Sequence, residues 1–424
     1  MEVVPCKRRP YSTLEKIEMK KTLVALASIA SVSAFAQVSI TGLVDMGYGR
    51  IDYKGNAVTF SALPNGSATS NFTFLVSEDL GGGMKADARW EIDPDLTQTV
   101  GKTSGTSATG TTSNVTSFLG NGYSFLGLSG GFGDLKMGTL NYATLSANGD
   151  GNLGIGTAIG SGYRVSSFDA VRAQNSMRYD TPVMNGFSAS YLLSEKNDLQ
   201  ANVLTTGMTG NLVNQTEGRD KASEFGLLYS AGPLTARYAA LTTEQWGKTA
   251  TVYGTLGSAY NITSWTSGTG AQFKLNTLSV KYDVTSAVSV GYFNQQAKSD
   301  SLIVANAAAT GSTTTVFDRK TNGIAVSYTN GPMKYIVNYQ NVTNGDGAVK
   351  AAATSTASTT SLSGLSAKVL GLAVDYSLSK RTTVYGRYEK DTDSSASFRA
   401  VTGYTAATGN TTYTATAIGV RHTF

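Results

Sequence analysis

Cysteine and histidine are almost absent from this sequence. The 424 residues include one of each, Cys6 and His422. A disulfide framework and a cysteine-ligated metal site therefore lack the residues that would build them. A histidine-cluster metal site is excluded in the same way, and His422, third from the end, is a poor candidate base for a Ser-His-Asp triad. We expect no metal and no cofactor.

Charged residues and long apolar runs are also scarce. Asp, Glu, Lys and Arg make up 15% of the chain, below the roughly 25% usual for soluble domains. Only one apolar run approaches membrane-spanning length, which argues against an α-helical membrane protein. The 22 tyrosines and the net charge of only +5 do not fit a disordered chain. A membrane β-barrel stays open, because alternating strands average to modest hydropathy.

The N-terminal region has the pattern of an export signal. Met19-Lys20-Lys21 supplies a charged start, residues 22–32 are apolar, and Ala34-Phe35-Ala36 is a small-x-small cleavage motif. The apolar stretch is too short to be a spanning helix. We therefore expect residues 19–36 to be a cleaved signal peptide and residues 1–18 to be a non-native upstream extension.

The remaining chain, 37–424, would carry a net charge of +2, because the removed part holds six Lys or Arg and three Asp or Glu. Such a balance does not favour nucleic acid as a partner. Its apolar pattern has a period of two. Residues 85–93 show this most clearly, with Ala, Trp and Ile at the even positions and charged side chains at Lys85, Asp87, Arg89 and Glu91.

Sixteen segments of this kind predict sixteen β-strands. Their approximate spans are 37–49, 69–79, 84–93, 121–129, 134–141, 174–181, 186–194, 222–231, 234–242, 273–284, 287–296, 320–329, 333–341, 367–378, 381–390 and 413–424.

The connections between these segments alternate strictly in length. The short ones are at 78–83, 129–133, 181–186, 231–233, 284–286, 330–332 and 378–380. The long ones are at 50–68, 94–120, 142–173, 195–221, 243–272, 297–319, 342–366 and 391–412. Antiparallel neighbours then place all the short turns at one end and all the long loops at the other. A Greek-key sandwich would mix the two, and an open sheet would leave two unpaired edges.

The pattern therefore predicts an all-β fold, a 16-stranded antiparallel transmembrane β-barrel with short periplasmic turns and long extracellular loops. Eighteen strands stay open as an alternative if the connection 243–272 contains a hairpin. One face of each strand is apolar, with tyrosines near strand ends as in an aromatic girdle. The opposite face carries charged side chains, and at about sixteen strands the interior holds a water channel.

Five short motifs resemble the trimeric general porins of Gram-negative outer membranes. Their order and spacing, more than any single motif, carry the resemblance, which extends from Gln37 to Phe424. The motifs are Ser39–Asp45, Glu78–Ala86, Gly127–Gly133, Asn175–Tyr179 and Gly419–Phe424. The resemblance implies a homotrimer in outer-membrane lipid and lipopolysaccharide. It also implies that Phe424 is an assembly signal recognised by the barrel-assembly machinery.

The resemblance further implies that the third loop, about 142–173, folds into the lumen to form a constriction. The candidate loop residues are Asp150, Arg164, Asp169 and Arg172. The candidate wall residues are Lys85, Arg89, Lys136, Arg178 and Arg387. Two other roles stay open for the loop residues: the acids bind a divalent cation or cap a turn, and the arginines pair with those acids.

The predicted function is passive diffusion of ions and small hydrophilic solutes through a water-filled channel, with selectivity set at the constriction. Cation or anion preference stays open, because several positions that are often basic in the family are not basic here. The alternatives are a substrate-specific channel, an adhesin-like barrel with a plugged lumen, and a barrel hydrolase. We expect no enzymatic activity, and conductance separates an open channel from the plugged barrel and the hydrolase.

Overall fold

The computed structural model describes residues 37–53, 60–94, 96, 122–154, 159–161, 172–195, 212–215, 221–245, 249–252, 264–266, 271–306, 311–345, 348–350, 359–361, 363–394 and 412–424. Structural statements below concern this part of the chain. The expected upstream extension 1–18 and signal peptide 19–36 lie outside it.

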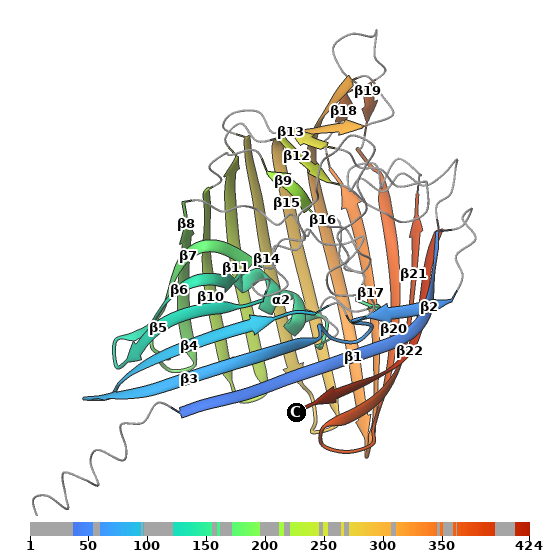
Figure 1. Cartoon of the computed structure of the whole chain (residues 1–424). Helices are drawn as coiled ribbons and strands as arrows, with labels where there is room; N and C mark the ends of the chain where they lie inside the picture. The colour runs from blue at the N-terminus through green and yellow to red at the C-terminus, as the bar shows by residue number, and fades with distance from the viewer. Residues whose placement is uncertain are drawn as a thin grey trace, which may run out of the picture.

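Sixteen long strands pair edge to edge around a closed antiparallel barrel (Figure 1). In barrel order they are β1 (Gln37–Tyr53), β3 (Asn71–Gly81), β4 (Met84–Ile92), β5 (Ser124–Gly130), β6 (Gly133–Asn141), β7 (Arg172–Asp180), β8 (Phe187–Ser194), β10 (Lys221–Ala231), β11 (Leu234–Gln245), β14 (Ala271–Asp283), β15 (Val288–Asn306), β16 (Gly311–Asn330), β17 (Met333–Asn344), β20 (Ser366–Ser377), β21 (Thr382–Asp393) and β22 (Thr412–Thr423).

Closure is made by the first and last strands. β22 pairs with β1 from Leu43↔Thr423 to Tyr53↔Tyr413, so no barrel edge is left unpaired. Every one of the sixteen predicted strands is present, and all but two of them, β15 and β16, lie within a few residues of the predicted boundaries. The prediction of a 16-stranded antiparallel barrel is confirmed.

The eighteen-strand alternative is wrong. β11 pairs directly with β14, beginning at Leu234↔Tyr282, so no further strands enter the barrel between them. The short strands β12 (Thr249–Val252) and β13 (Ser264–Thr266) pair with each other and with β9 (Leu212–Gln215) and β15. They lie at the upper end of the barrel in Figure 1, together with β18 (Ala348–Lys350) and β19 (Thr359–Ser361).

The structure differs most from the sequence prediction at 297–319, which was predicted to be a loop and is largely β-strand. β15 continues to Asn306 and β16 already begins at Gly311, and the two pair along this extension after a register shift between Ser299 and Leu302. The stretch lacks strict apolar alternation, so its sequence resembles a loop. Its Ile303, Val304 and Val316 and the three threonines at 313–315 nevertheless have high β propensity, and each strand supplies the other's hydrogen-bond partners.

The tight turns lie at the lower end of the barrel in Figure 1. The turn between β3 and β4 needs glycine at three successive positions, because Gly81, Gly82 and Gly83 have φ values of 79°, 62° and 79°. Residues with a Cβ rarely adopt this conformation. The glycine run is therefore turn material, as predicted.

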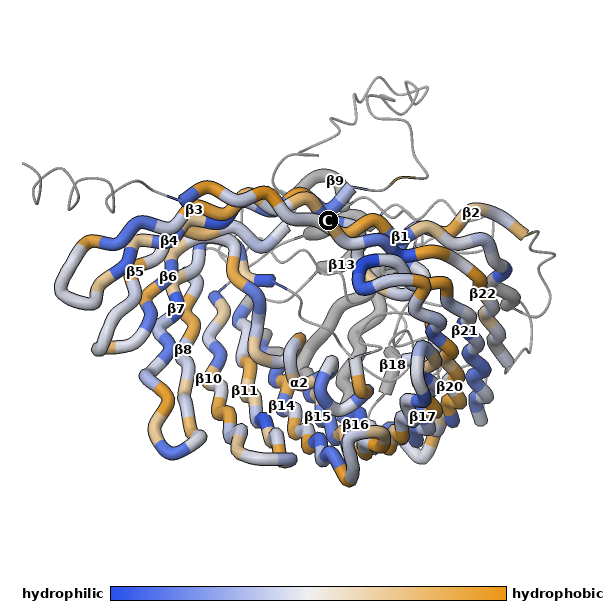
Figure 2. Tube along the Cα trace, turned by 90° about the horizontal axis from the view of Figure 1, so that it is seen from below, coloured by the Kyte–Doolittle hydropathy of each residue, from blue (hydrophilic) through white to orange (hydrophobic). Residues whose placement is uncertain are grey.

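The two faces of the wall have different chemistry, as β17 illustrates. Tyr335, Val337 and Tyr339 are 40%, 48% and 42% exposed, whereas Ile336, Asn338 and Gln340 at the alternate positions are buried. The outer face is thus apolar and the inner face carries polar side chains among buried apolar ones, in the sense that the alternation predicts. Colouring by hydropathy shows the same alternation along the strands (Figure 2).

One helix is described, α2 (Ala143–Gly151), and it lies inside the ring of strands when the barrel is viewed from below (Figure 2). It follows β6 within the segment 142–173. Within the described residues, no helix combines the length and apolar character needed to cross a membrane.

Candidate functional site

The first turn of α2 is bound to the inner wall by a buried carboxylate. The backbone N–H groups of Ala143 and Thr144 and the hydroxyl of Thr144 all donate to Glu224 of β10, the latter two at 3.0 and 2.8 Å. The residue preceding α2 supplies no side-chain cap. Glu224 therefore satisfies orphan N–H groups at the positive end of the helix dipole.

The last turn of α2 is held by an ion pair. Asp150 Oδ2 lies 2.8 Å from Nε of Arg237 on β11. The predicted loop acid Asp150 thus has a basic partner on the wall. The same guanidinium and carboxylate are 21% and 27% exposed, so the pair is partly hydrated.

The residues after α2 continue along the inner wall. Asn152 Oδ1 accepts hydrogen bonds from Asn338 (2.7 Å) and Gln340 (3.0 Å) of β17. The carbonyl of Ser161 accepts from Gln340 (2.6 Å), and the N–H of Gly160 donates to Glu389 of β21 (2.7 Å). Described parts of the segment 142–173 therefore contact strands from β10 to β21. Arg164 and Asp169 lie outside the described residues.

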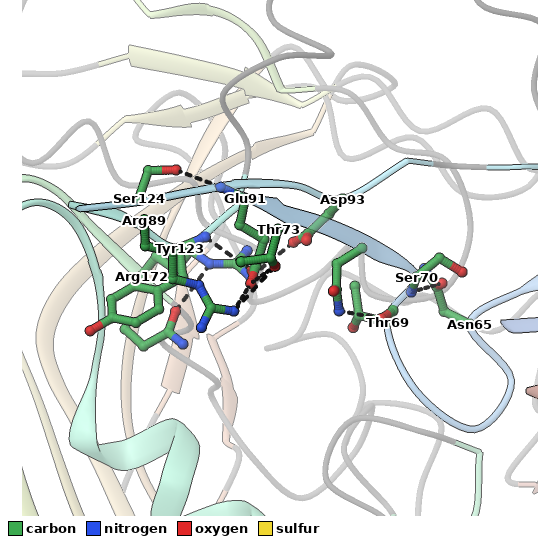
Figure 3. Close-up of polar contacts among 12 residues, drawn as sticks. Asn65, Thr69, Ser70, Thr73, Arg89, Glu91, Asp93, Tyr123, Ser124 and Arg172 are labelled. Atoms are coloured by element: carbon green, nitrogen blue, oxygen red, sulfur yellow. Dashed lines mark hydrogen bonds and ion pairs between the residues drawn. The ribbon is translucent and has the colours of Figure 1, made fainter. Parts of the chain in front are cut away.

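A second cluster joins two predicted arginines to two acids (Figure 3). Arg172 Nη2 lies 2.8 Å from Oδ2 of Asp93 and 3.2 Å from Oε1 of Glu91. Arg89 forms an ion pair with the other oxygen of Glu91, and its guanidinium lies 5.2 Å from the centre of the Tyr123 ring. The four charged groups sum to zero, so the cluster presents a local field rather than a net charge.

Asp93, which follows the last residue of β4, has an unusual titration. Burial raises the pKa of Asp93 to about 6, and Glu91 adds to the rise, although the Arg172 guanidinium opposes it. The side chain of Asp93 is only 10% exposed. The charge of this cluster therefore changes near pH 6.

The acids of this cluster were not among the predicted site residues. Glu91 shares a strand face with Arg89, two residues away, which is a signal that the sequence does contain. Asp93 and Arg172 meet through the fold alone, because they come from separate segments.

Two further predicted cations form a four-residue charged cluster with two acids on β6 and β7. Lys136 is directly opposite Arg178, and Asp134 is directly opposite Asp180. Lys136 pairs with Asp134 and, at 3.7 Å, with Asp180, while Arg178 lies 2.6 Å from Asp180.

The other two predicted wall cations lie in different surroundings. Arg387 is buried and lies 2.6 Å from Asp375, and it donates to Ser67 Oγ at 2.8 Å. Lys85 is exposed one residue into β4, beside the turn, and no ion pair involves it within the described residues.

The segment containing Ser67 also contacts the inner wall, although no pattern in the sequence predicts this contact. Asp45 of β1 accepts hydrogen bonds from the N–H groups of Ser67 (2.9 Å) and Ala68 (2.6 Å) and from the Tyr385 hydroxyl (2.5 Å). Arg421 also donates to Ser67 Oγ at 3.1 Å. Part of the predicted first long loop therefore packs on the inner face of β1, β21 and β22.

The chain terminus lies at the barrel seam. Phe424 exchanges two backbone hydrogen bonds of 3.1 Å with Gly42, and its ring packs on Phe72 at a centroid distance of 5.5 Å. The side chain is 39% exposed on the outer face. A Cβ at position 42 would collide with the Phe424 ring, so this glycine leaves room for the terminal aromatic.

Comparisons with known proteins agree with this architecture. The sequence matches the model of the family described as Gram-negative porin over residues 22–396. It is 33% identical over 196 residues to the major outer membrane protein P.IB of Neisseria lactamica, covering 43% of this chain and 52% of that protein. It is 30% identical over 187 residues to the outer membrane porin protein 32 of Delftia acidovorans, covering 41% of this chain and 49% of that protein.

The chain spans about half the length of these curated relatives. Among solved structures, the anion-selective porin from Comamonas acidovorans superposes with a TM-score of 0.61 at 19% identity, covering 92% of this chain and 100% of that one. This likeness shows a shared fold.

Proposed function

The chain belongs to the Gram-negative porin family and is an outer-membrane protein, and from that premise we propose that it forms a water-filled channel. Ions and small hydrophilic solutes diffuse through this channel down their gradients. Family membership points to a channel rather than an enzyme.

One observation carries the proposal: sixteen strands close on themselves around a polar inner face. A barrel of about this size encloses more space than its own side chains fill. The ion pairs Asp150–Arg237 and Arg387–Asp375 and the Glu91 cluster all face this interior. Charged groups are tolerated there when water hydrates them or when they are paired.

Size selection is assigned to the segment 142–173. Its described residues take up part of the lumen and are fixed to the wall at Glu224, Arg237 and Gln340. A segment held at several points keeps a defined opening, because each anchor would have to break before it moved. Solutes wider than the remaining opening are excluded.

We assign the selection of ions by their charge to the predicted loop and wall residues. The loop residues in this proposal are Asp150, Arg164, Asp169 and Arg172, and the wall residues are Arg89, Lys136, Arg178 and Arg387, with Lys85 at the periplasmic end. Acids and bases held in fixed pairs create a local field across the lumen, which orients water and disfavours apolar solutes.

Assembly and partners follow from the family. We infer a homotrimer, outer-membrane lipid including lipopolysaccharide around the barrel, and recognition of Phe424 by the barrel-assembly machinery. The exposed ring of Phe424 at the seam is accessible for such recognition. Native mass spectrometry of detergent-purified protein tests the trimer directly.

The decisive experiment is single-channel recording in a planar bilayer. An open channel gives stepwise conductance that grows in proportion to salt concentration. A substrate-specific channel gives the same steps but is blocked in a saturating manner by its solute. A plugged adhesin-like barrel passes no current, and that result would reject the diffusion channel.

A further inference from the structure

The segment 61–70, which precedes β3, combines a short strand with an inward turn. It begins as β2 (Ser61–Pro64), which pairs with Met46–Gly49 of β1 (Figure 1). β3 pairs with a lower part of β1, Gln37–Leu43, so β2 continues the wall along the edge of β1 that β3 leaves. We call residues 61–70 the inner strap.

A buried carboxylate holds the turn of the inner strap. Asp45, which is 0% exposed, accepts hydrogen bonds from the N–H groups of Ser67 at 2.9 Å and Ala68 at 2.6 Å. The backbone N–H of Asp45 donates to Ser70 Oγ at 2.9 Å. Within the strap, the N–H of Ser70 donates to Asn65 Oδ1 at 2.7 Å (Figure 3). These bonds satisfy backbone groups that a buried turn would otherwise leave unpaired, so the strap is fixed in place.

Tyr385 of β21 lies under the strap in a cradle of glycines. Its side chain is 2% exposed, and its hydroxyl donates to Asp45 at 2.5 Å. At three glycines around it, an added Cβ would come within 2.9 Å of the hydroxyl oxygen. They are Gly47 of β1, Gly66 of the strap and Gly419 of β22. The absence of side chains at these positions lets the strap approach the wall closely.

Leu63 of the strap packs with a residue of the segment 142–173. Leu63 is 3% exposed and forms one buried apolar cluster with Ala415 and Ala417 of β22 and with Ile159, which is 5% exposed. Ile159 belongs to the segment that also contains α2. The inner strap and this segment, which come from different loops, therefore share a buried apolar contact region.

The wall holds the same part of the segment by other contacts. The N–H of Gly160 donates to Glu389 of β21 at 2.7 Å. Gly371 of β20 lies so close that an added Cβ there would collide with the Gly160 carbonyl. We call residues 159–161 the tip. The tip is held by the wall at Gly160 and by the Leu63 cluster at Ile159.

The contact with the strap is a substantial part of what holds the tip. A fully buried leucine contributes at least as much stability as a typical net hydrogen bond. Loss of the Leu63 side chain would leave the hydrogen bond from Gly160 to Glu389 but would remove apolar packing and open a cavity beside Ile159. The tip would then leave the wall more often.

We propose that the inner strap is a seat for the tip, and that Leu63 is the residue that positions it. Two loops then set the opening of the channel, because the segment 142–173 depends on the strap for its position. Asp45 and Tyr385 are positioning residues that act through the strap. The proposal deepens the channel function given above and rests on it.

The test is a double-mutant cycle in the full protein with Leu63→Ala, Ile159→Ala and the two changes together. Single-channel recording measures brief current fluctuations, and liposome swelling measures the entry of sugars of increasing size. We expect each single variant to raise the frequency of fluctuations by about tenfold or more and to admit larger sugars. The double variant should fluctuate no more than the stronger single variant, since both changes remove the same packing.

Matched variants separate positioning from general stability. Leu63→Met keeps the side-chain volume and should behave like the parent protein. Val342→Ala removes a side chain that is 0% exposed in a separate cluster with Ala367 and Val369, and its currents should stay quiet. Leu63→Val should show the same effects in smaller measure and serves where Leu63→Ala does not insert into bilayers.

Two outcomes would overturn the proposal. In the first, Leu63→Ala lowers the unfolding temperature but leaves the fluctuations and the size limit unchanged, as for a side chain that only stabilises the barrel. In the second, the effects of Leu63→Ala and Ile159→Ala add, so that the two side chains act independently.

Hydrogen exchange separates this proposal from the channel function, because it needs no current. Mass spectrometry of the peptide that contains residues 159–161 should show exchange about tenfold faster in Leu63→Ala than in the parent protein. Unchanged exchange would reject the seat. A parent protein that passes no current would contradict the channel, and the exchange measurement would still decide whether the strap holds the tip.

Discussion

Arg172 and Asp93 form an ion pair of 2.8 Å, although β5 and β6 separate β4 from β7 in the barrel. Arg172 is the first residue of β7 and also donates from Nε to Asn141 Oδ1 at 3.0 Å. Its guanidinium therefore reaches across two strands to the end of β4. This geometry joins the end of the segment 142–173 to the wall and gives the first prediction.

Replacing Arg172 with glutamine should shift the ion selectivity of the channel toward cations. The change leaves Glu91 and Asp93 with one arginine instead of two. A hydrated unit charge at about 4 Å changes an ion's energy by on the order of 1 kcal/mol, which is about fivefold in occupancy. Reversal potential under a salt gradient measures the shift. Arg381→Gln, on an exposed turn, is the control and should leave the potential unchanged.

Lowering the pH from 7.5 to 5 should shift the ion selectivity of the channel toward anions. Asp93 has a pKa raised to about 6, so it is mostly ionised at pH 7.5 and mostly neutral at pH 5. Losing this negative charge while Arg172 stays positive favours anions. The reversal potential measured under a salt gradient should therefore indicate a greater preference for anions at pH 5 than at pH 7.5. Asp93→Asn should show the anion-shifted value at pH 7.5 and lose the step near pH 6. A step that persists in this variant would assign the titration to another group.

Removing the Glu224 carboxylate should let larger solutes pass through the channel. In Glu224→Ala, the N–H groups of Ala143 and Thr144 lose their acceptor, at a cost of about 1–3 kcal/mol. The first turn of α2 then detaches more often from β10. Liposome swelling with sugars of increasing size should show faster entry of the larger ones. Glu244→Ala removes an acid from the outer face of neighbouring β11 and is the matched control; equal size limits in both variants would contradict the anchoring role.

The strands and the site differ in how far the sequence predicts them. Each strand is a local pattern: alternation along β17 and glycines at 81–83 suffice to define a strand and a turn. The meeting of Arg172 with Asp93, or of Ser67 with Arg387, depends on how distant segments cross the lumen. Local periodicity does not contain that information. The length of β15 and β16 was underestimated for a related reason, because pairing with a partner strand outweighed a loop-like composition.

A close approach between two glycines gives the last prediction. Gly291 of β15 faces the carbonyl of Gly151 at the end of α2, so that a Cβ at position 291 would collide with it. Gly291→Val should displace the end of α2 from the wall or strain β15, costing about 1–3 kcal/mol as overpacking. We expect noisier single-channel currents and a lower unfolding temperature. Gly386→Val on β21 is the control, because an added Cβ there meets no atom within 4 Å. Quiet, parent-like currents in the Gly291 variant would show that α2 is not packed against β15 at this point.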